Sequence, residues 1–182
     1  VDYIPTAGFE NGRYRLHELS RLFAESCLEG VELVDAMRRH ADYYSKILSQ
    51  AGNLYMKGGK NLLEGLKLFD SEWANIKVGN EWIKSAIRSY RMFDKKYAKF
   101  IMKLAESYAK DGFNVLNLRL HPSDQIGLLK TGLMAAEIMK NRRAEEAHLG
   151  NLGLAYSQLG EQLKAIDFYE RALAISKEIG DM

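Results

Sequence analysis

The sequence has little cysteine and proline and no long apolar run, and each shortage excludes a class of protein. Its one cysteine, Cys27, allows no internal disulfide, and its place in an apolar helical stripe predicts a buried core thiol in a reducing compartment. The two prolines, Pro5 and Pro122, leave long stretches in which helices are unbroken. No apolar run approaches the roughly 18 residues that a membrane span needs. We therefore expect a cytoplasmic protein with no membrane partner.

The sequence also lacks an excess of charge of one sign. It has 26 basic and 24 acidic residues, a net charge of +2, which calls for neither nucleic acid nor an anionic membrane. A cluster of arginines near the N-terminus is offset by nearby glutamates, so we do not expect a nucleic acid partner. The arginines are Arg13, Arg15, Arg21, Arg38 and Arg39, and the glutamates are Glu18, Glu25, Glu29 and Glu32.

Groups of residues that carry catalysis or bind metals are missing as well. His40, His121 and His148 have no second ligand at metal-binding spacing, so no metal is predicted, and His40 is interpreted as part of a solvated face. Cys27 and Ser20 have no evident general base. The phosphate-binding loop Gly-x-x-x-x-Gly-Lys-Ser/Thr is absent. We expect no enzyme activity, no cofactor and no ATP or ADP binding by this chain.

What the sequence does have is apolar periodicity, in a composition that is 47% hydrophobic. Residues 1–17 alternate like two strands around Asn11 and Gly12, which predicts a small β-hairpin. Apolar residues at steps of three and four then predict successive helices. Gly58 and Gly59 should form a turn, and Asp70 or Ser71 should cap a new helix. The predicted helical stretches are 19–27, 31–51, 62–69, 73–90, 94–110 and 125–141, followed by one helix before and one after a break at 160–161, the second of them 165–181.

The stretch 150–172 has a distinctive pattern of small and large residues on two helices, with a break at Gly160. Gly153 and Ala165 are small enough for the two helices to approach closely. The large residues expected to fill the space around that approach are Leu152, Tyr156, Tyr169 and Leu173. Such a pair cannot bury its faces alone and needs similar pairs as neighbours.

This arrangement resembles a tetratricopeptide repeat. The motif positions of the family are occupied by Leu152, Gly153, Tyr156, Ala165, Tyr169 and Ala172. Leu149 stands at the usual initial aromatic, and Lys177 replaces the closing proline, so the second helix can run to about Ile179. A degenerate earlier copy aligns Leu104 with Leu152 and Gln125 with Ala165, with an eight-residue insertion in a predicted loop, 113–123. Ser123 should cap the helix after Pro122.

A second resemblance lies near the N-terminus. Leu16, His17 and Glu18, followed by a Leu-x-Arg-x-Phe-Ala pattern, are similar to the end of the winged-helix domain in signal-transducing ATPases of the plant-resistance-protein and apoptotic-activator class (STAND NTPases with NB-ARC-like domains). Glu18 stands where that family has Asp, and the run 69–76 resembles the segment that precedes repeats in bacterial members. The resemblance implies that His17 senses ADP in a longer parent protein, which carries the nucleotide site, and that this chain is a fragment.

Together these observations predict an all-α protein, a right-handed α-solenoid of antiparallel, tetratricopeptide-like helix pairs with a small N-terminal β-hairpin. Residues 1–30 would be a winged-helix remnant, 31–93 a helical linker array and 94–182 two helix pairs. The expected function is protein–protein interaction or effector sensing within a multidomain signal-transducing NTPase. The alternative is a free-standing tetratricopeptide adaptor or scaffold.

The resemblance also implies a binding groove for a protein or peptide effector. By position its residues are Ala147, Gly150, Asn151, Leu154, Ser157 and Gln158. They are small, apolar or neutral, so the carboxylate clamp of some cochaperones is not expected. Asn151 resembles the asparagine that pairs with the backbone of extended peptides in long-repeat scaffolds; alternatively it caps or crosses to the next helix. The last helix should expose an apolar face, through which the chain can self-associate.

Overall fold

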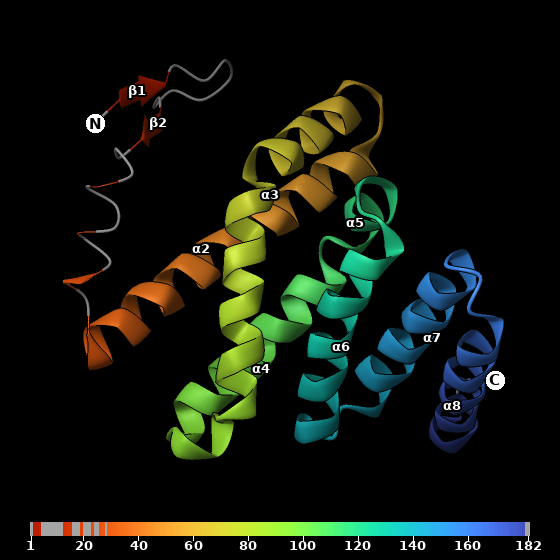
Figure 1. Cartoon of the computed structure of the whole chain (residues 1–182). Helices are drawn as coiled ribbons and strands as arrows, with labels where there is room; N and C mark the ends of the chain where they lie inside the picture. The colour runs from red at the N-terminus through yellow and green to blue at the C-terminus, as the bar shows by residue number, and fades with distance from the viewer. Residues whose placement is uncertain are drawn as a thin grey trace. The chain divides into compact units, whose positions relative to one another are not determined.

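The computed structural model describes residues 2–4, 13–15, 19, 23, 26, 27 and 29–180. Residues 1–38 and residues 39–182 form two separate compact units. The described part contains seven α-helices, and these pack in antiparallel pairs (Figure 1). The prediction of an all-α chain built from antiparallel helix pairs is confirmed at this level.

Two short strands are described near the N-terminus. β1 (Asp2–Ile4) pairs antiparallel with β2 (Arg13–Arg15), with Tyr3 opposite Tyr14. The turn predicted at Asn11 and Gly12 lies outside the described residues, and so does His17 with its neighbours Leu16 and Glu18.

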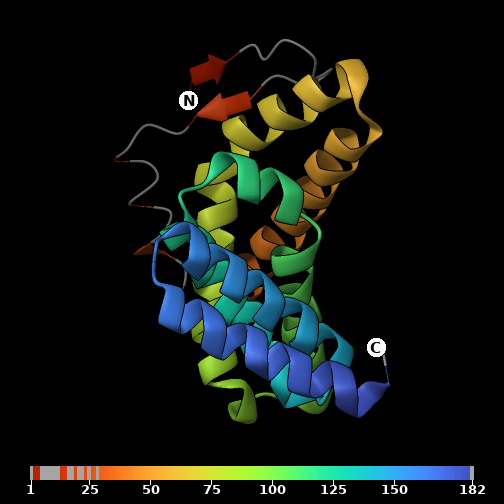
Figure 2. The same cartoon turned by 90° about the vertical axis from the view of Figure 1, so that its right-hand side faces the viewer.

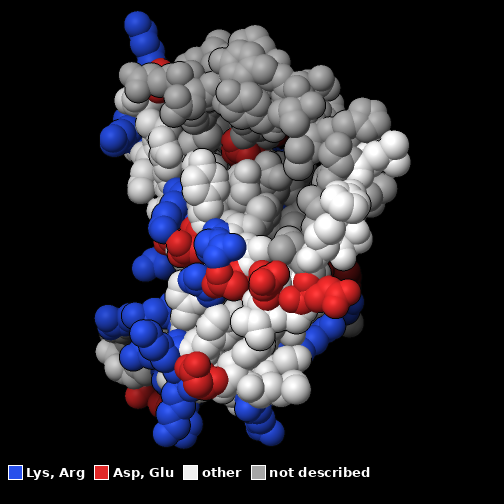
Figure 3. All heavy atoms as spheres, turned by 90° about the vertical axis from the view of Figure 1, so that its left-hand side faces the viewer, with Lys and Arg blue, Asp and Glu red and all other residues white. Residues whose placement is uncertain are grey.

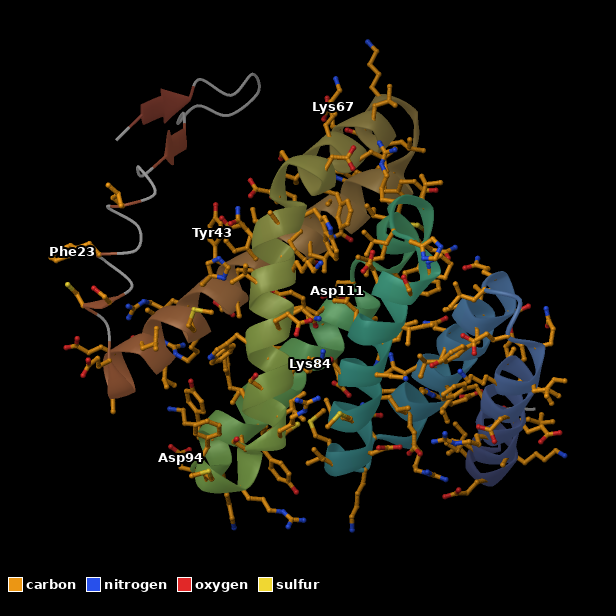
Figure 4. The ribbon with its side chains drawn as sticks, viewed as in Figure 1. Phe23, Tyr43, Lys67, Lys84, Asp94 and Asp111 are labelled. Atoms are coloured by element: carbon orange, nitrogen blue, oxygen red, sulfur yellow. The ribbon has the colours of Figure 1, made fainter. Side chains whose placement is uncertain are left out.

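The prediction of a buried Cys27 is wrong, because its side chain is exposed. Leu19 and Phe23, which belong to the same apolar stripe, are 70% and 71% exposed (Figure 4 labels Phe23). The described members of this stripe are therefore exposed.

The predicted turn at Gly58 and Gly59 is confirmed. It separates α2 (Gly30–Lys57) from α3 (Gly59–Arg88), and both glycines have positive φ, 69° and 57°. The predicted helix start at Asp70 or Ser71 is wrong, because α3 runs through both residues. Ser71 instead donates a hydrogen bond to the Leu68 carbonyl at 2.9 Å, and Asp70 pairs with Arg119 at 2.9 Å.

A 3₁₀ turn, η1 (Tyr90–Met92), leads from α3 into α4 (Lys95–Lys110). The Asp94 side chain accepts a hydrogen bond from the Tyr97 backbone N–H at 2.8 Å, so Asp94 caps α4 at the predicted start (Figure 4). The buried Tyr108 hydroxyl donates to the Ala41 carbonyl at 3.0 Å, which ties α4 to α2. Burial raises the pKa of this phenol, so it stays protonated and can keep donating.

The predicted loop at 113–123 is wrong, because it contains α5 (Phe113–Arg119). Val115 and Leu116 of α5 are buried, and their burial anchors this helix to the core. α6 (Pro122–Met139) begins with Pro122, and its cap is His121 rather than the predicted Ser123. The Nδ1 atom of His121 accepts a long hydrogen bond from the Ser123 backbone N–H at 3.4 Å.

The last pair consists of α7 (Arg142–Gln158) and α8 (Gln162–Ile179), with the predicted break at Gly160 and the predicted end at Ile179 (Figure 2). Arg142 pairs with Glu145 at 2.7 Å and also with Glu178, so it joins the start of α7 to the end of α8. Gly153 allows the close approach, since a Cβ there would lie 2.6 Å from the Tyr169 ring.

Residues 39–182 contain two apolar clusters, one built mainly from α2 to α6 and the other from α6, α7 and α8. α8 lies at the edge of the row formed by α4, α6, α7 and α8 (Figure 1). Its exposed large apolar residues are Leu163, Ile166, Tyr169 and Leu173, which are 85%, 51%, 43% and 50% exposed, although the Tyr169 ring also lies against Gly153 of α7. The prediction of an exposed apolar face is confirmed, whereas the packing predicted for Leu173 is wrong. No described helix has the length and apolar character to cross a bilayer.

Candidate binding site

A recess of about 450 Å³ lies between α4, α5 and α7, and we call it the α4–α7 recess. Its walls come from the second half of α4, the first turn of α5, the α6–α7 turn and the first half of α7. The lining residues are Glu106, Lys110, Phe113, Asn114, Asn141, Arg143, Ala144, Ala147, His148 and Asn151.

The α6–α7 turn is fixed against α4 by Asn141. Its side-chain N–H donates to Glu106 Oε1 at 3.0 Å, while its side-chain oxygen accepts from the Ala144 N–H at 3.3 Å and caps α7. One asparagine thus positions both the start of α7 and the carboxylate in the wall of the recess. The carboxylate of Glu106 is held by this contact instead of projecting freely into the recess.

His148 is the most deeply buried polar side chain in the wall of the recess, at 3% exposed. Its Nδ1 atom has no hydrogen-bond partner among the described residues. Gly132 of α6 makes room for the ring, because a Cβ at that position would lie 3.0 Å from His148 Nε2. Burial, together with the positive charge of Lys110, lowers the pKa of His148 to about 4. The ring is therefore neutral at pH 7, and its Nδ1 atom is a buried polar atom without a described partner.

The rest of the lining combines charge, amides and a small apolar floor. Lys110 and Arg143 face one carboxylate, that of Glu106, so the recess carries a positive balance. Ala144 and Ala147 are small and leave room above α7. Side-chain amides such as that of Asn151 can donate to and accept from a peptide backbone at once. The arrangement is suited to holding a polar, extended ligand.

The predicted groove residues are divided between the recess and the surface beyond it. Ala147 and Asn151 line the recess. Gly150 lies between them on α7, half-buried, with open space where a Cβ would stand. The other three are Leu154, Ser157 and Gln158, which lie further along α7 and are not among the lining residues.

The position of α5 explains this division. Gln158 donates a hydrogen bond to the Asn117 side-chain oxygen of α5 at 3.4 Å, so α5 lies beside the last turn of α7. The segment was predicted to be a loop, and the groove was placed along α7 by position in the resembled family, without a helix beside its last turn. His17, the proposed nucleotide sensor, lies outside the described residues.

Sequence reasoning missed Lys110, Arg143 and His148, because it transferred positions from a family pattern on the second helix pair alone. A signal for one wall was nevertheless present. Ala144, Ala147, His148 and Asn151 recur at steps of three and four, which places them on one stripe of α7. The cationic residues of α4 could not be assigned to the same site without knowing how α4 and α7 pack.

The interpretation of His40 as part of a solvated face is wrong. Its ring is half-buried and packs on Tyr44, with centroids 4.6 Å apart, and its Nδ1 atom is buried without a partner among the described residues. Burial lowers the pKa of His40.

In the part of the chain that the structure describes, no three His, Cys, Asp or Glu side chains come together as they would around a metal ion. The chain matches no protein-family model, no curated protein and no solved structure.

Proposed function

We propose that this chain is a protein-interaction segment without catalytic activity of its own, and that the α4–α7 recess holds an extended peptide of a partner protein. The observation that carries this proposal is the recess itself, with Asn151 and Ala147 on one wall and a buried, unpaired His148 Nδ1 beside them. An extended peptide brings the N–H and C=O groups that such side chains satisfy.

The dimensions support a peptide. Ala144 and Asn151, with Ala147 between them, are seven residues apart on α7, which corresponds to about 10 Å of helix. An extended chain covers that distance with about three residues. The volume of about 450 Å³ accommodates side chains that such a segment would insert.

We also propose, from the sequence resemblances, that the chain is a tetratricopeptide-like part of a signal-transducing NTPase. The pairing of α4 with α6 and of α7 with α8 is consistent with two tetratricopeptide-like pairs in a right-handed solenoid. The segment would serve as the effector sensor of a signal-transducing NTPase, in which His17 senses ADP. Peptide binding would act as a switch only if it favours one domain arrangement over another.

This finer assignment has a direct test in the gene. The coding sequence preceding Val1 should contain a phosphate-binding loop within a few hundred codons. A start codon close to Val1, with no such loop, would instead favour a free-standing adaptor. Neither result tests whether the α4–α7 recess binds a peptide, which requires a binding measurement.

The recess is tested with peptides selected from a random dodecapeptide phage library on the intact chain. Ala147→Trp fills the recess from an exposed helical position, and Ala74→Trp makes the same change at an exposed position of α3. We expect Ala147→Trp to weaken binding by at least about tenfold in fluorescence anisotropy, and Ala74→Trp to leave it unchanged. Selected peptides that bind both variants like the parent chain would show that the recess is not the site.

A further inference from the structure

α4 is far more basic than the rest of the chain. It carries five lysines against one glutamate, a net charge of +4 within a single helix, whereas the whole chain has a net charge of +2. Figure 3 shows Lys and Arg side chains gathered at the lower end of the face that it presents.

Four of these lysines form a stripe that leads into the α4–α7 recess. They lie at steps of three, four and seven residues, which places them on one side of the helix, and all four are exposed. We call them the lysine stripe: Lys96, Lys99, Lys103 and Lys110. The opposite side of α4 carries the buried Ile101, Leu104 and Tyr108. Lys110 itself lines the recess.

The stability of the fold does not account for the lysine stripe. Some cations elsewhere have acidic partners, for example Lys46 with Asp42 and Arg119 with Asp70, whereas others, such as Lys60 and Lys67, have none among the described residues. No ion pair among the described residues involves a member of the lysine stripe. Lysines four residues apart, such as Lys99 and Lys103, repel each other along a helix. Cations in the first turn also oppose the helix dipole.

We propose that the partner peptide is acidic, with carboxylates along the lysine stripe and its backbone in the α4–α7 recess. This inference rests on the proposed peptide-binding function. Arg143 adds a cation from α7, so the positive surface continues across the recess from one helix to the other. Complementary charge of this kind fixes the orientation of a bound chain and speeds its association.

The lining of the recess favours a peptide over nucleic acid. Glu106 lies between Lys103 and Lys110 on α4 and repels phosphates and carboxylates alike, so it does not distinguish the two partners. Ala144, Ala147 and Asn151 offer small apolar and amide surfaces, which suit a polypeptide backbone better than a row of phosphates.

The test uses the dodecapeptide selection on the intact chain and then a matched pair of double variants. Lys103→Glu with Lys110→Glu reverses the lysine stripe. Lys60→Glu with Lys67→Glu makes the same charge change at exposed positions of α3 (Figure 4 labels Lys67). We expect the selected peptides to be rich in Asp and Glu. Stripe reversal should weaken their binding at least about tenfold, and the α3 control should be close to the parent chain.

Two further measurements complete the test. Replacing every Asp and Glu of the best peptide by Asn and Gln should weaken its binding about tenfold or more, and added salt should weaken the acidic form alone.

The selected peptides could instead show no acidic bias while Ala147→Trp still blocks their binding. That result would overturn the acidic partner and leave the peptide-binding function standing. A failure of Ala147→Trp to affect any selected peptide would remove both. Tighter binding of a twelve-nucleotide single-stranded DNA, lost on stripe reversal, would overturn the inference in favour of nucleic acid.

Discussion

His148 is the residue at which the core and the recess meet. Its ring packs against Gly132 of α6, and its Nδ1 atom is buried without a described partner. Burying a polar atom without a hydrogen bond costs free energy, and a ligand that forms this hydrogen bond offsets that cost. The sequence does not reveal this role, because a lone histidine in a helix has the same pattern whether it is exposed or buried.

The lowered pKa of His148 predicts a pH dependence of stability. In the unfolded chain the imidazole takes up a proton near pH 6.5, whereas in the folded chain it does so only near pH 4. As the pH falls from 6.5 to 4, the unfolded state therefore gains protons that the folded state does not. The free energy of unfolding should fall by about 3 kcal/mol over this window because of His148.

Urea unfolding of the parent chain and of His148→Gln at a series of pH values measures this effect. The variant lacks the titrating ring, so the difference between the two free energies of unfolding should shrink or change sign between pH 6.5 and 4. His40, whose pKa is also lowered, acts in the same direction in both proteins and cancels in the comparison. A constant difference across the window would show that His148 is not buried as a neutral ring.

At the scale of elements, the helices with clear boundaries could be predicted from the sequence. Gly58 with Gly59, Asp94 and Gly160 mark turns or caps by mechanisms that act within a few residues. The exact extent of the others could not be predicted. Asp70 and Ser71 resemble a cap, but the apolar period of α3 continues through them. The segment of α5 was predicted to be a loop because the alignment of the two repeats placed an eight-residue insertion there, and its seven residues are too few to show a helical period.

The recess shows the same limit. Ala147 and Asn151 could be placed on a binding face from the repeat pattern, since that face depends on α7 alone. Lys110, Arg143 and Phe113 join them only because α4, α5 and α7 converge. That convergence depends on contacts distant in sequence, such as the bond from Asn141 to Glu106, and no local pattern encodes it.

The cap of α4 gives a prediction at this scale. Asp94→Ala removes the acceptor of the Tyr97 N–H and should lower the free energy of unfolding by about 1 kcal/mol. Asp94→Asn keeps an acceptor oxygen and should cost much less. Denaturant unfolding of the three proteins measures both changes. An equal loss in the two variants would mean that the negative charge at this basic end, and not the cap, is what stabilises α4.

At the scale of the whole molecule, the apolar side of α8 has no covering element among the described residues. Leu163, Ile166 and Leu173 lie on one side of this helix and are half-exposed or more. A contiguous apolar surface of this kind commonly associates with another surface. We expect the chain to self-associate through α8 at high concentration.

Analytical ultracentrifugation over a range of concentrations tests this expectation. Ile166→Glu with Leu173→Glu should lower the average mass at high concentration towards that of the monomer. Leu63→Glu, a change at an isolated exposed leucine of α3, should have no such effect. A parent chain that remains monomeric at every concentration would contradict the role of α8.

The central claim is that the α4–α7 recess binds a peptide, and amide chemical-shift mapping tests it most directly. The isotope-labelled chain is titrated with the best selected dodecapeptide. We expect the largest shifts at the amides of Lys110, Ala147, His148 and Asn151. The other three members of the lysine stripe should show smaller shifts, and α8 should show none. Shifts that concentrate on α8, or that leave the amides of the recess unchanged while the peptide binds, would contradict the central claim.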